Sequence, residues 1–293
     1  KEGWARVEAG VVKDQLNKAI KSHGLFFAPE LSTSNRATIG GMINTDASGQ
    51  GSVLYGKTRD HVIALKTVLL DGHLLESFPI DDDTLASIQS GEDYSAHVHR
   101  VVDGIQKSKA QQIKDTFPAL NRCLTGYDLA HIRTADGRFN MNSVLCGSEG
   151  TLGFIVEAKM NLLPIPTFAA LVNIRYDSFE GSLRHARELL NAQPTSIETV
   201  DSKVLGLAKS DIIWHSVAEF FPETTGENIQ GINLVEYTGN SEEDVANKIK
   251  VLTDQLDALA KQGGSSALGY TLDRKSTRLN SSHVALSRMP SSA

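Results

Sequence analysis

The first half of the chain carries recognisable strand and helix patterns of apolar residues. Residues 5–11 alternate between apolar and polar side chains, which predicts a short strand. Val12, Leu16 and Ile20 then recur every four residues, which predicts a helix ending at Gly24. The same criteria predict a strand over 61–70, a turn at 71–72 with a return strand over 74–78, a helix over 94–117 and a strand over 154–160.

The second half has its own succession of elements. Pro164 and Pro166 interrupt the pattern, and we place a domain boundary there. Beyond them the expected elements are a strand over 169–176, a helix over 179–191, a strand over 196–200, a short helix from 202, a strand over 231–237 and a helix from 240. Strands and helices in this order predict an α+β sandwich of ferredoxin-like type.

A segment rich in small residues lies between the first helix and the first long strand. It covers residues 38–49, contains the pair Gly40-Gly41, and is followed by Tyr55-Gly56. Paired glycines let a ligand approach the backbone closely, and exposed N–H groups can face a phosphate or a flat ring. We therefore expect an irregular ligand-binding loop, although a lone Gly-Gly pair usually marks only a tight turn. A second glycine-rich turn covers 147–153.

These blocks resemble the flavin-binding domain of the vanillyl-alcohol-oxidase (PCMH-type) superfamily. The flanking sequences at 29–34 (Pro-Glu-Leu-Ser-Thr-Ser) and 55–60 (Tyr-Gly-Lys-Thr-Arg-Asp) contribute to the match. Within the superfamily the chain is similar to bacterial D-2-hydroxyglutarate dehydrogenase-like, FAD-linked oxidoreductases of the D-lactate dehydrogenase and glycolate oxidase type. The resemblance implies FAD as the cofactor and an α+β fold. In that fold, the second half of a PCMH-type FAD-binding domain (1–163) precedes a ferredoxin-like substrate or cap domain (164–273).

The resemblance also implies which residues contact FAD. Those matching the diphosphate and ribityl contacts are Leu31, Ser32, Thr33, Ser34, Thr38, Ile39, Gly40 and Gly41. Those that run toward the ring or support it are Asn44, Ser48, Gly49, Tyr55 and Gly56. Those that close the adenine and flavin side are Glu149, Gly150 and Ile155.

By the same resemblance, the activity is oxidation of a D-2-hydroxy acid, either D-2-hydroxyglutarate or D-lactate, to the 2-keto acid by hydride transfer to flavin. The family's upstream glycine-rich loop has no counterpart before residue 5. Its carboxylate-binding arginine and its histidine-rich metal and base motif would lie beyond residue 272. We therefore expect an internal fragment that is inactive alone, with catalytic residues unassigned and no metal ligands of its own. Two alternatives stay open: a non-catalytic FAD-binding module, and a flavin reductase of the UDP-enolpyruvylglucosamine type.

The histidines within the chain do not replace the missing motif. His97 and His99 share a face only on a strand, and their region is predicted to be helical. His215 is interpreted as a packing residue beside Trp214, and Arg175 as part of a solvated face.

Composition restricts the partners and the cellular compartment that we expect for the chain. A net charge of −6 argues against a nucleic-acid partner, and no apolar run reaches the length of a membrane span. Cys123 and Cys146 provide neither a disulfide framework nor a metal cluster, which favours the cytoplasm. Residues 274–293 contain six serines and no acid, and they resemble translated adapter DNA. We expect them to be a disordered, artefactual tail.

Overall fold

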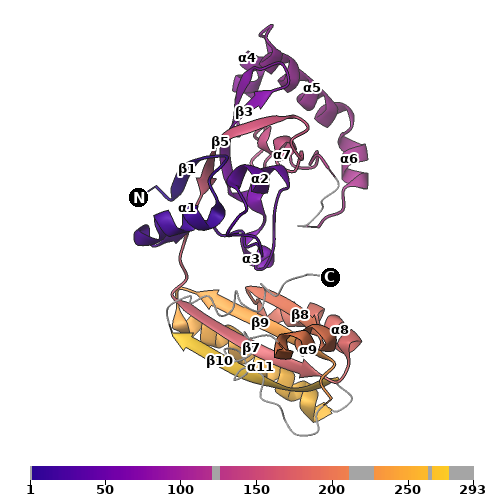
Figure 1. Cartoon of the computed structure of the whole chain (residues 1–293). Helices are drawn as coiled ribbons and strands as arrows, with labels where there is room; N and C mark the ends of the chain where they lie inside the picture. Colours follow the sequence, from indigo (N-terminus) through magenta and orange to yellow (C-terminus); the bar gives the residue numbers. More distant parts are fainter. Residues whose placement is uncertain (1, 121–125, 211–227, 263–265, 277–293) are drawn as a thin grey trace. The chain divides into compact units, whose positions relative to one another are not determined.

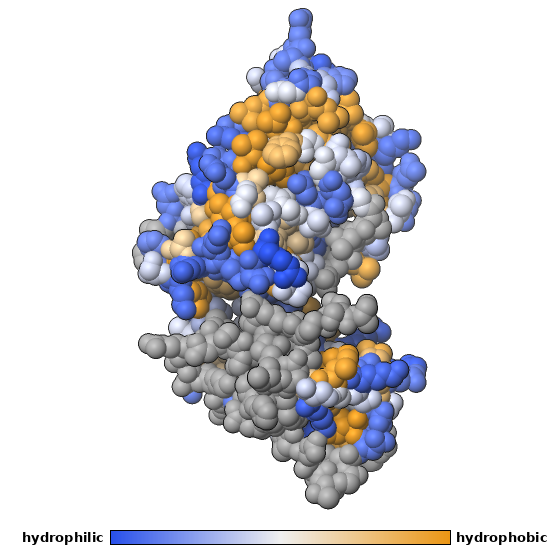
Figure 2. Space-filling view, in the orientation of Figure 1, coloured by the Kyte–Doolittle hydropathy of each residue, from blue (hydrophilic) through white to orange (hydrophobic). Residues whose placement is uncertain are grey.

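Figure 1 shows the computed structural model, which describes residues 2–120, 126–210, 228–262 and 266–276. The chain divides into two compact units, residues 1–165 and 166–293. Each unit has its own sheet and its own apolar core. Figure 2 shows that both hydrophilic and hydrophobic residues lie on the visible face of each unit.

The first unit contains a four-stranded antiparallel sheet with the order β1-β5-β3-β4. Its strands are β1 (Trp4–Glu8), β3 (Val62–Leu69), β4 (Leu74–Ser77) and β5 (Gly153–Asn161). Strand β1 pairs with β5 from Trp4↔Asn161 to Glu8↔Glu157. Because the two strands are antiparallel, the chain leaving β1 and the chain entering β5 lie at the same end of the sheet.

Helices and short elements complete the first unit, and α2 and α7 pack on its sheet. The helices are α1 (Lys13–Ile20), α2 (Ile39–Asn44), α3 (Ser52–Tyr55), α4 (Asp82–Gln89), α5 (Tyr94–Ser108), α6 (Ala110–Thr116) and α7 (Asn142–Leu145). The short elements are η1 (Lys21–His23), η2 (Thr58–His61), and the pair β2 (Leu25–Phe26) and β6 (Leu163–Pro164). Leu65 and Met160 of the sheet pack in one cluster with Ile39 and Ile43 of α2 and Leu145 of α7. Alternate strand residues therefore supply one buried face, as their pattern predicts.

The helices between β4 and residue 116 differ from the sequence expectation. The helix expected over 94–117 is divided at Lys109 into α5 and α6. Helix α4 was not expected, because Leu85 is the only buried side chain among its eight residues. It begins at a carboxylate cap, in which Asp81 accepts a hydrogen bond from the Thr84 amide at 2.8 Å.

The second unit confirms the ferredoxin-like prediction. Its elements are β7 (Phe168–Tyr176), α8 (Phe179–Leu189), η3 (Leu190–Ala192), β8 (Ser196–Asp201), α9 (Ser202–Ser210), β9 (Gly231–Gly239), α11 (Glu242–Gln262) and β10 (Ala267–Ser276). The sheet order is β10-β7-β9-β8, so the first and third strands of the unit lie at its centre. Val245, Ile249 and Leu252 of α11 pack on Val172 and Val235 of the sheet.

The end of the second unit lies beyond the expected limit of residue 273. Strand β10 pairs with β7 through Ser276↔Phe168, so residues 274–276 have backbone partners instead of belonging to a tail. The remainder of the expected tail, residues 277–293, lies outside the described residues.

Candidate cofactor site

The glycine-rich segment after Thr38 is a helix, so the expectation of an irregular loop was wrong. The Thr38 hydroxyl caps α2 by accepting a hydrogen bond from the Gly41 amide at 3.2 Å. Ile39, Met42 and Ile43 lie at the helical spacing of three and four and are at most 2% exposed. Burial of this apolar face outweighs the low helix propensity of the glycines.

The two glycines of α2 have different surroundings. A Cβ on Gly40 would lie 2.7 Å from the Ala9 Cβ, so helix α2 packs directly on the chain that leaves β1. The Gly40 amide also donates to the Ala9 carbonyl at 2.8 Å. Gly41, in contrast, is exposed. Of the two, Gly41 is therefore the one whose backbone a ligand can approach.

The predicted segments 31–34 and 48–49 contact each other. Ser34 is fully buried, and its hydroxyl donates to the Leu31 carbonyl at 2.7 Å, which closes a turn beside α1. A Cβ on Gly49 would lie only 2.1 Å from the Glu30 carbonyl oxygen. Only glycine at this position allows the two backbones to approach so closely.

The second glycine-rich turn is bonded to the C-terminal end of α2. Gly147, Glu149 and Gly150 have φ values of 81°, 53° and 74°, the left-handed region that is unusual for a residue such as glutamate. The Gly147 amide donates to the Ile43 carbonyl at 2.9 Å, and the Glu149 amide donates to the Asn44 carbonyl at 2.9 Å. Residues about a hundred positions apart in the sequence thus share one site.

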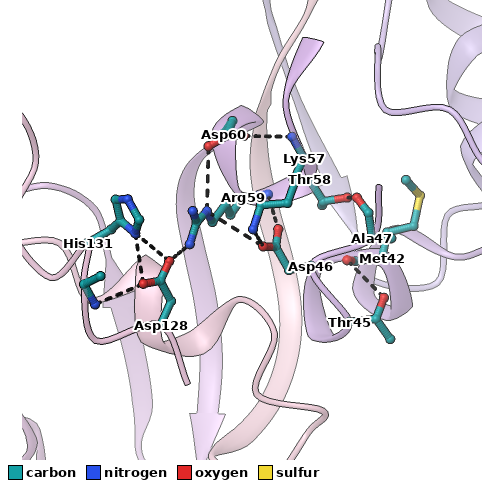
Figure 3. A network of polar contacts seen from close by, with 11 residues as sticks. Met42, Thr45, Asp46, Ala47, Lys57, Thr58, Arg59, Asp60, Asp128 and His131 are labelled. Atoms are coloured by element: carbon teal, nitrogen blue, oxygen red, sulfur yellow. Dashed lines mark hydrogen bonds and ion pairs between the residues drawn. The ribbon is translucent and has the colours of Figure 1, made fainter. Parts of the chain in front are cut away.

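A buried ion pair closes the loop of residues 47–56 (Figure 3). The Asp46 carboxylate lies 2.7 Å from the Lys57 ammonium, and their side chains are 6% and 1% exposed. Beside this pair, the Thr58 amide and hydroxyl both donate to the Ala47 carbonyl, at 3.0 and 2.6 Å. The two ends of the loop are therefore fixed to each other.

Arg59 connects this loop to a segment that sequence analysis did not identify. Its guanidinium is ion-paired with the Asp128 carboxylate, which also accepts a hydrogen bond from His131 Nδ1 at 2.8 Å (Figure 3). The pKa of His131 lies below its ordinary value because the imidazole is partly buried and because Arg59 and Lys57 carry positive charge nearby. The His131 side chain nevertheless remains 60% exposed.

The same segment also contacts the second glycine-rich turn. The hydroxyls of Tyr127 and Thr151 lie 2.8 Å apart and share a hydrogen bond. Residues 126–131 have neither helical nor strand periodicity, so hydrophobic patterning gave no signal for them. The one available signal was chemical, a carboxylate and an imidazole three residues apart in an irregular stretch.

Two other predicted contact residues have side chains that point into the core. Ile39 and Ile155 are 0% and 4% exposed, and both side chains lie in the core of the first unit. The Tyr55 carbonyl accepts a hydrogen bond from His61 Nε2 at 2.8 Å, and the neighbouring Gly56 has φ of 73°. Any contact of Ile39 or Ile155 with a cofactor would therefore be made mainly by main-chain atoms.

Two family comparisons bear directly on this site. Residues 1–77 match the family described as "FAD binding domain", and residues 165–286 match "FAD linked oxidases, C-terminal domain". The chain therefore contains matches to both the FAD-binding domain and the C-terminal domain of FAD-linked oxidases. The prediction of FAD as the cofactor is confirmed at the level of the family.

Curated relatives of this family give the same assignment. The chain is 58% identical over 271 residues to the D-2-hydroxyglutarate dehydrogenase of Pseudomonas putida and 46% identical over 275 residues to that of Escherichia coli. These alignments include 92% and 94% of the chain. The chain spans about 27% of the length of each relative. The D-lactate dehydrogenase of Anaerostipes hadrus is 24% identical over 248 residues, or 84% of the chain and 40% of that protein.

A solved structure of alkyldihydroxyacetonephosphate synthase has the same fold, with a TM-score of 0.56 and 18% sequence identity. The match covers 92% of this chain and 40% of that one.

The residues at the site fit a flavin nucleotide. Small residues and exposed backbone dominate it, as a pyrophosphate or a flat ring requires. The Asn44 side-chain oxygen is buried and has no hydrogen-bond partner among the described residues, so it is available to an N–H donor of a ligand. Cys146 beside the site is 2% exposed, and burial raises the pKa of its thiol, so it behaves as a buried apolar residue.

The remaining candidates do not form a second site of the kinds considered above. His97 is exposed while His99 is buried and bonded to the Ser95 carbonyl, so the two do not converge on a metal. Arg175 lies in β7 and is 8% exposed, which corrects its interpretation as part of a solvated face. His215 lies outside the described residues.

In the described part of the chain, no cluster of histidine, cysteine and acidic residues could hold a metal ion. Likewise, no described helix has the length and apolar character needed to cross a membrane.

Proposed function

We propose that this chain supplies part of the FAD site and the substrate cap of a dehydrogenase that oxidises a D-2-hydroxy acid to the 2-keto acid. D-2-hydroxyglutarate is the favoured substrate and D-lactate the second candidate. Support comes from the relatives that are 58% and 46% identical and carry the name D-2-hydroxyglutarate dehydrogenase. Because the chain spans about 27% of those relatives, the activity is proposed for the whole protein of which the chain is part.

The observation that carries the proposal is the attachment of the 147–150 turn to the end of α2. Two backbone hydrogen bonds, Gly147 N to Ile43 O and Glu149 N to Asn44 O, join two segments that the resemblance predicts to contact FAD. Contact between Gly49 and Glu30 joins two more of them. The convergence of these segments supports a single continuous cofactor site.

Within that site, the chain's own residues would position the cofactor and restrict its movement. FAD, when bound, supplies the acceptor for the hydride that leaves the Cα of the hydroxy acid. The exposed Gly41 backbone and the Asn44 amide would orient the nucleotide, and the buried Asp46–Lys57 pair would hold the intervening loop in place. The substrate also needs a base for its hydroxyl proton and a cation for its carboxylate. We assign neither group within this chain.

The second unit is proposed to act as the substrate cap. Its match to the C-terminal domain of FAD-linked oxidases favours this function over a reductase of the UDP-enolpyruvylglucosamine type. A non-catalytic FAD-binding module remains the second candidate function. We further propose a cytoplasmic location, because two cysteines in the sequence are too few for a disulfide framework.

The test is anaerobic titration of the full-length protein. We expect it to purify with FAD and the flavin absorbance band to bleach when D-2-hydroxyglutarate is added, more slowly with D-lactate, and not with either L-enantiomer. Bound FAD that none of the four acids reduces would support the non-catalytic module. A full-length protein that neither retains nor binds FAD would contradict the proposal.

A further inference from the structure

Residues 126–131, the bridging segment, contact both sides of the proposed cofactor site. One side is the loop from Asp46 to Asp60, and the other is the turn from Gly147 to Thr151. Both sides contain residues expected to contact FAD. The bridging segment itself belongs to neither, and no comparison assigns it a role.

Two adjacent residues of the bridging segment make the contacts. Tyr127 hydrogen-bonds Thr151, 2.8 Å away on the turn. Asp128 is ion-paired with Arg59 on the loop, and both side chains are largely buried, at 13% and 14% exposure. Because the residues are consecutive, any movement of the loop relative to the turn must break one of the two contacts or distort the backbone between them.

The bridging segment is itself held in shape around Asp128. The Ala130 amide donates to the Asp128 carboxylate at 3.0 Å, and His131 Nδ1 lies 2.8 Å from it. The Leu129 amide donates to the Tyr127 carbonyl at 3.1 Å. These bonds fix the direction of the Asp128 side chain, which is what a rigid connection requires.

The charges argue that this network positions the site instead of binding the pyrophosphate directly. Lys57 and Arg59 are both paired with carboxylates, and the three carboxylates of Asp46, Asp60 and Asp128 outnumber the two cations (Figure 3). Such a cluster attracts a pyrophosphate weakly at best. Its effect on the cofactor must therefore act through the position of the loop.

We propose that the bridging segment is a positioning element, in which Tyr127 and Asp128 hold the two sides of the FAD site in a fixed position relative to each other. The inference rests on the proposed function, because it requires FAD to bind between the loop and the turn. Tyr127 and Asp128 are positioning residues and are assigned no contact with the reacting atoms.

The experiment compares full-length wild-type protein with Asp128→Asn, Tyr127→Phe and the double variant. Each apoprotein is titrated with FAD, and the dissociation constant and the visible circular dichroism of bound flavin are recorded. We expect each single variant to bind FAD about tenfold more weakly, the equivalent of one hydrogen bond, and to alter the flavin dichroism. The double variant should bind about as weakly as either single variant, because breaking one contact already releases the bridge.

Two matched variants serve as controls. Asp136→Asn removes the partner of Arg138 from an exposed ion pair, and Tyr94→Phe removes a hydroxyl from an exposed tyrosine on α5. Both should leave the FAD dissociation constant and the flavin dichroism unchanged.

The outcomes separate this proposal from the proposed function. Wild-type affinity and dichroism in both single variants, with or without a lower melting temperature, would overturn the positioning role while leaving the FAD site intact. A double variant that weakens FAD binding by the product of the two single-variant effects would overturn the proposed bridge, because the two contacts would then act independently. Failure of the wild-type protein itself to bind FAD would overturn both proposals.

Discussion

At the scale of single residues, two features define the geometry of the proposed cofactor site: the buried Asp46–Lys57 ion pair and the close backbone contact between Gly49 and Glu30. Replacing Lys57 with methionine would leave Asp46 as a buried carboxylate without its closest cation, 2.7 Å away. We expect the free energy of unfolding to fall by about 3–5 kcal/mol, measured by urea denaturation. Lys66→Met is the matched control, because Lys66 is 33% exposed beside Glu76 and Glu157, and it should cost about 1 kcal/mol or less. Equal losses in the two variants would contradict a special role for the buried pair.

Gly49 allows a second test at this scale. Its φ is not positive, so a side chain is excluded here by space and not by backbone conformation. Gly49→Ala would place a Cβ 2.1 Å from the Glu30 carbonyl oxygen and should lower the free energy of unfolding by about 1–3 kcal/mol. Gly104 lies on α5, and a Cβ added to it would meet no atom within 4 Å beyond its own helix backbone. Gly104→Ala should therefore stabilise the protein by up to about 1 kcal/mol. A neutral Gly49→Ala would show that the two backbones separate easily.

At the scale of elements, strong periodicity predicted the fold well. The heavily buried strands β7 and β9 and the long amphipathic helix α11 appear where their patterns placed them. Helix α2 was missed because its six residues are too few to show a period against two glycines. The bridging segment was missed for a different reason. Its role depends on contacts with Arg59 and Thr151, which are distant in sequence, and no local pattern encodes such contacts.

The packing of α8 on its sheet depends on a polar group that can titrate. Asn233 donates from Nδ2 to the Tyr176 hydroxyl at 3.0 Å, so that hydroxyl is oriented to donate to His185 Nδ1, 2.8 Å away. His185 must therefore be unprotonated at Nδ1. Burial lowers its pKa below the ordinary value of 6.5, and the opposing effect of Glu188 is smaller.

The sign of the resulting pH dependence follows from linkage. Between the lowered native pKa and 6.5 the unfolded chain binds more protons, so the contribution of His185 is complete above pH 6.5 and is lost as the pH falls toward the native pKa. Urea denaturation at a series of pH values should show this loss in wild type. The loss should be smaller in His185→Gln, which offers an acceptor that does not titrate in this range. His97→Gln, on the exposed side of α5, should keep the wild-type profile. A wild-type profile in His185→Gln would exclude this residue as the source.

At the scale of the whole molecule, every residue expected to contact FAD belongs to the first unit, whereas the second unit matches the C-terminal domain of FAD-linked oxidases. Binding of FAD should therefore slow amide hydrogen exchange in the first unit and change it little in the second. Hydrogen exchange of the full-length protein, with and without FAD, can detect this. We expect slower amide exchange on FAD addition in residues 31–49 and 147–151, since a ligand that binds only the native state suppresses opening of its site. Exchange in the central strands β7 and β9 should change little, because their amides are already held in the sheet. The exposed helix α6 provides an internal reference within the first unit and should not respond. Protection confined to the second unit would place the cofactor away from the glycine-rich segments, and it would contradict the site assigned to Gly41, Asn44 and the 147–150 turn.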